Sequence, residues 1–286
     1  MSNSVLKSLA RRLSSRWVLR ASVFALIAAY LAFCADFYLY PERYLLEPNA
    51  DPAGGRLSGL NEAEFVLPVR GEEEVHYRKY FTAALPSKGT VFYLHGNKGN
   101  MDKCEWEIEF LIERGYDVWT MDYRGYGASV GPISELALKE DAKAVFDTLQ
   151  ENDSSKPTIV WGRSFGSGVA ASVVATTHKK PQMLVLETPY WSLVDAVRQK
   201  HPYLPPFVFR YELPVYKFLP SANCPIHLIH GTQDEKIPAN SSDRLLEHCH
   251  DKGIEAIGHS VMCGKHNLRG TMEFERIANR ILTSNE

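Results

Sequence analysis

TIVWGRSFGSGVAASVVA, residues 158–175, decides the fold of this 286-residue chain. The first four residues are β-branched or aromatic, which predicts a buried strand, and the second half is rich in small residues, which predicts a helix packed closely on a sheet. Between them, GRSFG at 162–166 is a G-x-S-x-G sequence. A hydroxyl nucleophile must stand free of its own strand and helix, and flanking glycines let the backbone double back without Cβ clashes. Ser164 is therefore the candidate nucleophile.

A negatively charged oxygen that develops beside Ser164 needs hydrogen-bond donors. The N-terminus of the predicted helix offers exposed N–H groups and the positive end of the helix dipole. A second donor is expected from HGNKGN at 95–100, which follows the apolar run TVFYL at 90–94. The backbone N–H groups of Asn97 and Phe165 are the predicted donor pair. We expect His95 to be a structural histidine under this loop.

A neutral serine is a poor nucleophile, so the site needs a general base. Among the ten histidines, His266 lies in the loop CGKHN at 263–267, between the last predicted strand and the last predicted helix. This position suits a base that reaches over the sheet edge to Ser164. His259, directly after a strand end, is the alternative.

The base in turn needs a carboxylate that holds its tautomer and stabilises the imidazolium. HGTQDEKIP at 230–238 leaves the apolar run PIHLI and offers Asp234. Glu187, at the end of an earlier strand, and the adjacent Glu235 are the alternatives. Asp234 is favoured, because it lies at the loop position after a strand where this partner is expected, and the chain order Ser164, Asp234, His266 matches the order that the fold requires.

Apolar runs of strand length alternate with helical patterns along the rest of the chain. This alternation predicts an α/β fold: a mostly parallel sheet of about eight strands with helices on both faces. The strands are expected at 64–68, 75–81, 90–94, 117–121, 158–161, 183–186, 226–229 and 255–257. The helices are expected at 104–113, 134–151, 165–177, 241–249 and 270–283. The first two strands form a hairpin-like entry to the sheet.

Residues 190–224 do not read as one helix, since they contain five prolines and many aromatic residues. We expect a cap-like insertion of several short pieces. Two interpretations of its aromatic side chains stay open: a mobile apolar flap over the site, or simple packing on the sheet. In DYRGYG at 122–127, Asp122 and Arg124 are expected to hold neighbouring loops rather than to do chemistry.

The N-terminal segment has the pattern of a membrane anchor. Residues 21–35 carry no charge and follow a leader with five basic residues and no acid. A spanning helix needs about 20 apolar residues, and the flanking Trp17, Tyr38 and Tyr40 suit the membrane interface. We predict a basic leader and transmembrane helix at 1–40, a linker at 41–59 and a catalytic domain at 60–286.

A cleaved signal peptide is the main alternative to an anchor. Its cleavage site, Ala32-Phe33-Cys34, has a small residue at only one of the two usual positions, which favours retention of the helix. The basic leader then predicts a cytoplasmic N-terminus, with the catalytic domain on the opposite side of the membrane.

Charge and cysteine content restrict the partners. The net charge is −2, and the leader contributes +5, so the rest of the chain carries −7. An acidic body argues against a nucleic-acid partner. The five cysteines form no C-x-x-C pair, and no ligand set is spaced for a metal. Free thiols and disulfides both stay open, and nothing indicates an oligomeric state.

HGNKGN, DYRGYG, GRSFG, HGTQDEKIP and GKHN occur in this order. With them the chain resembles the α/β-hydrolase superfamily over about residues 60–284. More narrowly, it resembles single-pass membrane serine hydrolases whose oxyanion loop reads H-G-N-x-G-N. The resemblance implies an acyl-enzyme mechanism without a metal or organic cofactor. Ser167 and Lys265 stand where many similar sequences have glycine, so a substrate does not transfer by analogy.

The expected function is hydrolysis of a carboxylic ester or thioester in a small-molecule or lipid acyl substrate, and the anchor favours a lipid. Two alternatives stay open. One is a peptidase or amidase that uses the same three residues, and the other is a non-catalytic binding protein built on this fold.

Overall fold

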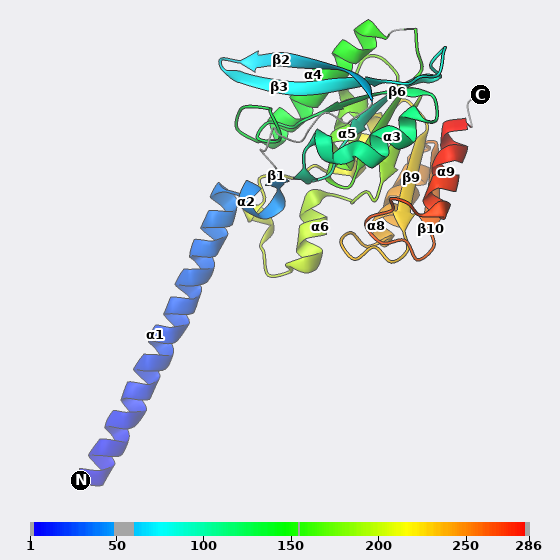
Figure 1. Cartoon of the computed structure of the whole chain (residues 1–286). Helices are drawn as coiled ribbons and strands as arrows, with labels where there is room; N and C mark the ends of the chain where they lie inside the picture. The colour runs from blue at the N-terminus through cyan, green and yellow to red at the C-terminus, as the bar shows by residue number, and fades with distance from the viewer. Residues whose placement is uncertain (1–2, 49–59, 154, 284–286) are drawn as a thin grey trace.

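The computed structural model describes residues 3–48, 60–153 and 155–283. Its main sheet has eight strands in the order β10-β9-β8-β7-β4-β6-β3-β2. Figure 1 shows β2 and β3 at one side of the body and β9 and β10 at the other. The eight predicted strands are confirmed, most of them longer than predicted. They are β2 (Asn61–Arg70), β3 (Glu73–Phe81), β4 (Gly89–Leu94), β6 (Tyr116–Met121), β7 (Thr158–Arg163), β8 (Met183–Glu187), β9 (Ile226–Gly231) and β10 (Ala256–Val261).

The pairing of the strands places the loops that carry the candidate site at one edge. β2 pairs antiparallel with β3, and β3 pairs antiparallel with β6, which is the predicted hairpin-like entry. The pairs from β6 through β4, β7, β8 and β9 to β10 are all parallel. Because parallel strands end at the same edge, the loops after β4, β7, β9 and β10 meet there.

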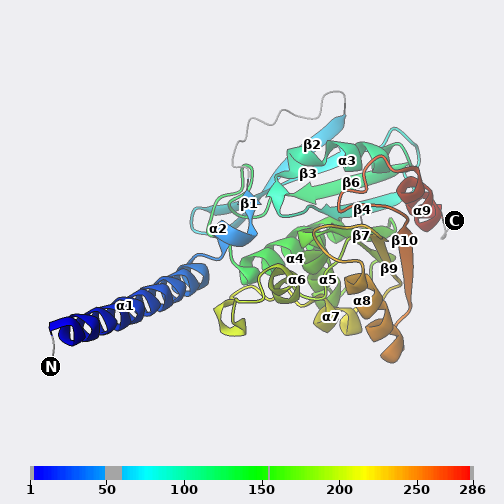
Figure 2. The ribbon, with the colours of Figure 1, turned by 90° about the horizontal axis from the view of Figure 1, so that it is seen from below.

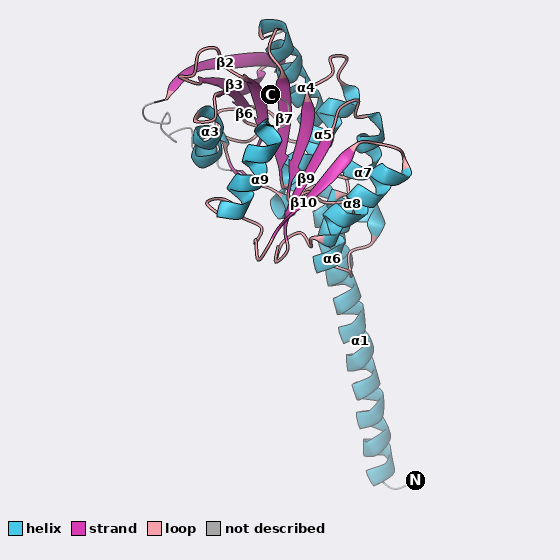
Figure 3. Ribbon diagram, turned by 90° about the vertical axis from the view of Figure 1, so that its right-hand side faces the viewer, coloured by secondary structure: helices cyan, strands magenta, loops and turns pink. Residues whose placement is uncertain are grey.

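Side chains of the central strands alternate between two hydrophobic cores. On β4, Phe92 and Leu94 pack in one core, and Val91 and Tyr93 pack in the other. Helices cover both faces, as predicted (Figure 3). They are α3 (Glu105–Ile112), α4 (Glu135–Asn152), α5 (Phe165–Thr176), α8 (Asn240–Asp251) and α9 (Met272–Thr283). The start of α4 is capped by Ser134, whose side chain accepts a hydrogen bond from the Ala137 N–H.

The insertion at 190–224 consists of short helical pieces, as its prolines predict. They are α6 (Leu193–Lys200), η2 (Pro206–Val208), α7 (Val215–Phe218) and η3 (Leu219–Ser221). Some of its aromatic side chains pack against the body, as the second interpretation expects, and others are exposed; whether the insertion moves stays a prediction. Tyr211 is buried, and Tyr216 stacks on Trp191 with 4.5 Å between ring centroids. Tyr203 and Phe207 are exposed.

The N-terminal helix α1 (Asn3–Leu39) projects from the body (Figures 1 and 2). Its stretch Arg16–Leu39 is long and apolar enough to cross a membrane. The structure differs from the expected linker at 41–59, because α2 (Glu42–Leu45) and β1 (Glu47–Pro48) are ordered. The reason is burial of Leu45 and Leu46 against the body. The rest of that linker, 49–59, lies outside the described residues.

Candidate active site

Ser164 occupies the sharp turn between β7 and α5. Its backbone has φ 51° and ψ −118°, a strained conformation for a residue with a side chain. A Cβ on Gly162 would lie 2.4 Å from the Gly166 carbonyl oxygen, and a Cβ on Gly166 would lie 2.1 Å from that of Leu94. Both flanking positions therefore require glycine, as the sequence argument expects, and the turn holds the serine hydroxyl clear of the strand.

The structure brings the three predicted side chains together at this edge. Ser164 Oγ lies 2.9 Å from His266 Nε2, and His266 Nδ1 lies 2.8 Å from Asp234 Oδ2. An ionised carboxylate only accepts hydrogen bonds, so Nδ1 carries the imidazole proton and Nε2 is free to accept the serine proton. Loops after β7, β9 and β10 thus supply a hydroxyl, a carboxylate and an imidazole in hydrogen-bonding order.

The environment of Asp234 keeps it ionised. Burial opposes its charge, but hydrogen bonds from His230 and His266 hold the pKa of the carboxyl well below its usual range. Oδ1 also accepts hydrogen bonds from the backbone N–H groups of Lys236 at 2.8 Å and Ile237 at 2.9 Å. These contacts fix the carboxylate in the plane that the imidazole needs.

His230 is a supporting residue that the sequence argument missed. Its Nε2 lies 3.2 Å from Asp234 Oδ2 and 2.8 Å from the carbonyl oxygen of Ile237, so this nitrogen is the donor. Its Nδ1 lies 2.6 Å from Ser242 Oγ and accepts from that hydroxyl. The available signal was its spacing, four residues before Asp234 in HGTQD.

The alternative base and acids make other contacts. The ring of His259 stacks on that of His227, with His259 Nε2 3.1 Å from His227 Nδ1. Glu187 accepts a hydrogen bond from Arg163 Nε at 3.0 Å. Burial opposes the charge on Arg163, but the carboxylate of Glu187 raises the pKa of the guanidinium above its ordinary value. Glu235 contacts the backbone N–H of the base residue rather than its ring.

His95 orients the peptide that carries the Asn97 N–H. Burial lowers the pKa of His95 to about 4, so its ring is neutral near pH 7. His95 Nδ1 lies 2.7 Å from the carbonyl oxygen of Gly96, and an acceptor there places the proton on Nδ1. The Gly96 carbonyl and the Asn97 N–H belong to one peptide, so this bond sets the direction of the predicted donor. Phe165, the other predicted donor, is the first residue of α5, where an N–H has no intrahelical acceptor.

The segment after α1 also holds this loop, a contact that the sequence did not indicate. The carbonyl oxygen of Asn97 accepts hydrogen bonds from the Glu47 N–H and the Tyr126 hydroxyl, both at 2.9 Å. Its side-chain Nδ2 donates to the Leu45 carbonyl oxygen at 3.1 Å. β1 pairs in parallel with β5 (Lys98–Gly99). The oxyanion loop is therefore fixed in part by the residues that follow α1.

Asp122 and Arg124 hold loops, as expected. Asp122 Oδ1 accepts a hydrogen bond from the Met101 N–H at 2.7 Å, and burial raises the pKa of this carboxyl to about 6. Arg124 donates to both carboxylate oxygens of Asp141, at 2.7 and 2.8 Å, and to Glu73 at 2.6 Å.

Comparison with known proteins shows which fold carries this geometry. Residues 86–221 match the family Hydrolase_4, described as serine aminopeptidase, S33. An esterase from Pyrococcus furiosus has the same fold, with a TM-score of 0.65 at 20% identity over 84% of this chain and 96% of its own. The chain has the α/β-hydrolase fold. A thermostable carboxyl esterase from Bacillus coagulans superposes with a TM-score of 0.64 at 15% identity over 78% of this chain and 97% of its own.

Two curated relatives of this chain differ in length. The lysophosphatidylserine lipase ABHD12 of Macaca fascicularis is 31% identical over 222 residues, which are 71% of this chain and 54% of that protein. Protein bem46 of Schizosaccharomyces pombe is 27% identical over 236 residues, which are 77% of this chain and 79% of that protein. The chain thus spans about half the length of the lysophosphatidylserine lipases that it matches.

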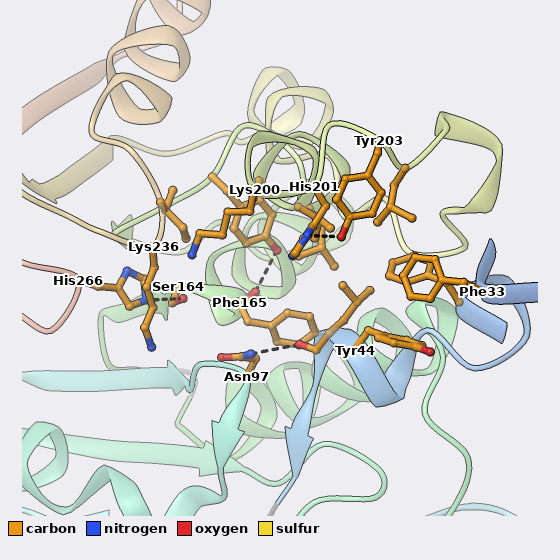
Figure 4. A pocket seen from close by; sticks show the side chains of 18 residues that line it. Phe33, Tyr44, Asn97, Ser164, Phe165, Lys200, His201, Tyr203, Lys236 and His266 are labelled. Carbon is orange, nitrogen blue, oxygen red and sulfur yellow. Dashed lines mark hydrogen bonds between the residues drawn. The ribbon is translucent and has the colours of Figure 1, made fainter. Parts of the chain in front are cut away.

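Two cavities of the chain meet at Ser164, and both are also lined by Asn97, His266 and Lys236. One has a volume of about 290 Å³ and runs between the insertion and α1 (Figure 4). We call it the apolar cavity, because its other lining side chains are mostly apolar or aromatic: Phe33, Phe37, Tyr44, Leu45, Phe165, Tyr190, Leu193, Ala196, Val197, Lys200, His201, Tyr203, Leu204 and Ile237.

The second cavity has a volume of about 680 Å³ and is lined by five basic side chains against two acidic ones. We call it the cationic cavity. Its basic residues are Lys98, Lys103, Arg163, Lys236 and Arg269, and its acidic residues are Glu47 and Glu235.

Proposed function

We propose that this chain is a serine hydrolase that cleaves carboxylic esters of acyl lipids, with Ser164 as nucleophile, His266 as general base and Asp234 as its orienting carboxylate. The continuous hydrogen-bond chain from Ser164 Oγ through the imidazole to the Asp234 carboxylate carries this proposal. A non-catalytic binding protein has no need for a strained serine aligned with an imidazole whose tautomer is fixed.

In the proposed mechanism, Ser164 Oγ attacks the ester carbonyl carbon while His266 Nε2 takes the hydroxyl proton. The carbonyl oxygen becomes an oxyanion, which the backbone N–H groups of Asn97 and Phe165 bind. His266 then returns the proton to the leaving alcohol as its C–O bond breaks. Water attacks the remaining acyl-enzyme in the same way, which releases the fatty acid and restores the serine.

The apolar cavity supports a lipid acyl chain as the group transferred to Ser164. Its walls are mostly aromatic and aliphatic, and it starts at the serine hydroxyl. The name of one relative, a lysophosphatidylserine lipase, points to the same class of substrate. We propose lipids with one acyl chain, because the cavity of about 290 Å³ is at the small end for a ligand site.

The cationic cavity supports an anionic group on the alcohol side of the ester. The charges of its two arginines are partly matched: Arg269 pairs with Glu107 at 2.6 Å and Arg163 pairs with Glu187 at 3.0 Å. Within the described part of the chain, the structure gives no acidic partner to the ammonium groups of Lys103 or Lys236. These two charges are available to a phosphate or carboxylate headgroup.

A comparison of acyl substrates tests the function. The full-length protein in detergent is offered a palmitoyl lysophospholipid, a monoacylglycerol, a palmitoyl thioester and an aminoacyl amide, and kcat/KM is measured for each. We expect the two oxygen esters to be cleaved fastest and the amide slowest. The positive N-terminus of a peptide is repelled by the basic side chains around Ser164. If the amide is cleaved faster than the oxygen esters, the protein is a peptidase. If the thioester is cleaved faster than the oxygen esters, it is a thioesterase and the ester proposal is wrong.

Charge reversal at Lys103 tests the headgroup site. We expect Lys103→Glu to lower kcat/KM for an anionic lysophospholipid by about 10-fold, since reversing one charge near the headgroup costs roughly 1 to 2 kcal/mol at a solvated site. The rate on a neutral monoacylglycerol should fall much less. Lys252→Glu, on the exposed turn after α8, is the matched control. Equal losses for the anionic and neutral lipids in Lys103→Glu would remove the headgroup assignment.

We further propose that α1 is an uncleaved anchor with a cytoplasmic N-terminus and the catalytic domain across the membrane. The basic leader favours this orientation. Packing of Phe37 and Cys34 against the body favours retention of the helix. Protease treatment of sealed vesicles from the cytoplasmic side should remove an N-terminal epitope and spare the catalytic domain. Removal of the catalytic domain with the N-terminal epitope spared would show the opposite orientation.

A further inference from the structure

The apolar cavity has a wall made by the end of α1, the helix with the composition of a membrane span. Phe33 and Phe37 of α1 line it together with Ser164 and His266. Figure 4 shows Ser164 and His266 at one end of the cavity and Phe33 with Tyr44 at the other. A helix that served only as a tether would not reach the site. This helix supplies part of the surface that faces a substrate.

The contact between α1 and the body is specific and confined to the end of the helix. The Phe37 side chain is 2% exposed, and its ring meets Phe209 edge-on with 5.4 Å between centroids. Phe33 meets Tyr44 edge-on at 5.8 Å. Phe24, on the same helix, is 72% exposed. The helix therefore does not contact the body at Phe24, and only its last turns, which carry Phe33 and Phe37, pack on the folded domain.

The insertion at 190–224 forms the facing wall. The hydroxyl of Tyr30 on α1 donates to the carbonyl oxygen of Tyr203 at 2.7 Å, which joins the two walls. Tyr203 lines the cavity and is 55% exposed, and Phe207 nearby is 77% exposed. Figures 1 and 2 show this part of the insertion on the side of the body from which α1 leaves. Exposed tyrosine and phenylalanine at that position suit a membrane interface.

The length of α1 sets the depth of this cavity relative to a bilayer. The span Arg16–Leu39 has 24 residues, which as a helix measure about 36 Å, slightly more than the roughly 30 Å of a hydrocarbon core. Phe33 lies six residues before Leu39, about 9 Å along the axis. When this span is centred in a bilayer, Leu39 lies about 3 Å outside the hydrocarbon core and Phe33 lies about 6 Å inside it, so the Phe33 end of the cavity is at the level of the acyl chains.

We propose that α1 and the insertion form a port through which the acyl chain of a bilayer lipid enters the apolar cavity and reaches Ser164. Phe33 and Phe37 are the surface along which the chain packs. The chain passes from lipid to protein without exposure of its methylene groups to water, which removes the main cost of extracting a lipid. This inference rests on the proposed ester hydrolysis and specifies its substrate as a lipid resident in the same membrane as α1.

Paired tryptophan substitutions on α1 test the port. The full-length protein is placed in phospholipid nanodiscs, and active sites are counted with a fluorophosphonate probe. The readout is the ratio of kcat/KM for a palmitoyl lysolipid to kcat/KM for a water-soluble p-nitrophenyl acetate. We expect Phe33→Trp, whose larger side chain narrows the apolar cavity, to lower this ratio at least fivefold. Phe24→Trp, which faces lipid on the same helix, should keep it. Equal ratios in the two variants would overturn the proposal.

A second measurement on the wild-type protein does not depend on how the variants fold. A slowly exchanging long-chain fluorogenic ester is placed either in the nanodiscs that carry the protein or in separate, protein-free nanodiscs. We expect hydrolysis at least tenfold faster when ester and protein share a disc. Equal rates in the two arrangements would contradict entry from the bilayer. If the protein cleaves neither the long-chain ester nor p-nitrophenyl acetate, the proposed function itself is contradicted, and not only the port.

Discussion

Ser164→Ala is expected to lower kcat/KM for a lysolipid or a p-nitrophenyl ester by about 10⁴- to 10⁶-fold, because no other group can form the acyl-enzyme. Ser164 Oγ lies 2.9 Å from His266 Nε2 in the wild type, and alanine removes that oxygen while keeping the Cβ in its place. Covalent labelling by a fluorophosphonate probe should disappear together with turnover. Both are measured on full-length protein, with circular dichroism as the check of folding.

Ser167→Ala is the matched control for this variant. Ser167 lies in the first turn of α5 and is fully buried, so its substitution perturbs the same helix without touching the proposed nucleophile. Labelling and turnover should stay within about threefold of the wild type, since alanine is the better helix former. Retained labelling in Ser164→Ala, or loss of labelling in Ser167→Ala alone, would contradict the assignment of the nucleophile.

The sheet could be predicted because buried parallel strands are continuous apolar runs. TVFYL and TIVW became β4 and β7, whose side chains enter cores on both faces. The site could be predicted for a related reason: Ser164, Asp234 and His266 each follow a strand, and the carboxyl ends of parallel strands meet at one edge. The sequence predicted which side chain acts on which, and the structure adds the distances between them.

The contacts that support the site could not be predicted. Glu47 binds the carbonyl oxygen of Asn97 through its backbone N–H, a bond that any residue except proline can make, so the side chain carries no signal. His230 supports Asp234 only because the loop after β9 turns back on itself, which depends on three-dimensional geometry. The short pieces at 190–224 lack a helical period, so burial of Tyr211 and exposure of Phe207 could not be told apart.

Asp234 gives the second large effect. We expect Asp234→Asn to lower kcat/KM by about 10⁴-fold, because an amide donor facing His266 favours the tautomer with the proton on Nε2, where it cannot accept the serine proton. The amide oxygen can still accept from the N–H groups of Lys236 and Ile237, so the loop keeps its fold. Single-turnover kinetics with a p-nitrophenyl ester measure the loss in the acylation step directly.

Glu235→Gln is the matched control, since Glu235 neighbours Asp234 and its contact with His266 is to the backbone N–H and not to the ring. A glutamine oxygen keeps that contact, and we expect a loss of less than tenfold. A larger loss in Glu235→Gln than in Asp234→Asn would exchange the roles of the two acids.

The pH dependence of unfolding separates the effect of Asp234→Asn on stability from its effect on catalysis. The pKa of Asp234 in the fold lies below its unfolded value of about 3.9, so its stabilising contribution is complete above that pH and is lost as pH falls through the folded pKa. Asp234→Asn should therefore lower the free energy of unfolding at pH 7 and weaken its decline in acid, measured by denaturant titration from pH 7 to pH 3. Activity lost in proportion to stability at every pH would show that Asp234 supports the fold and not the orientation of His266.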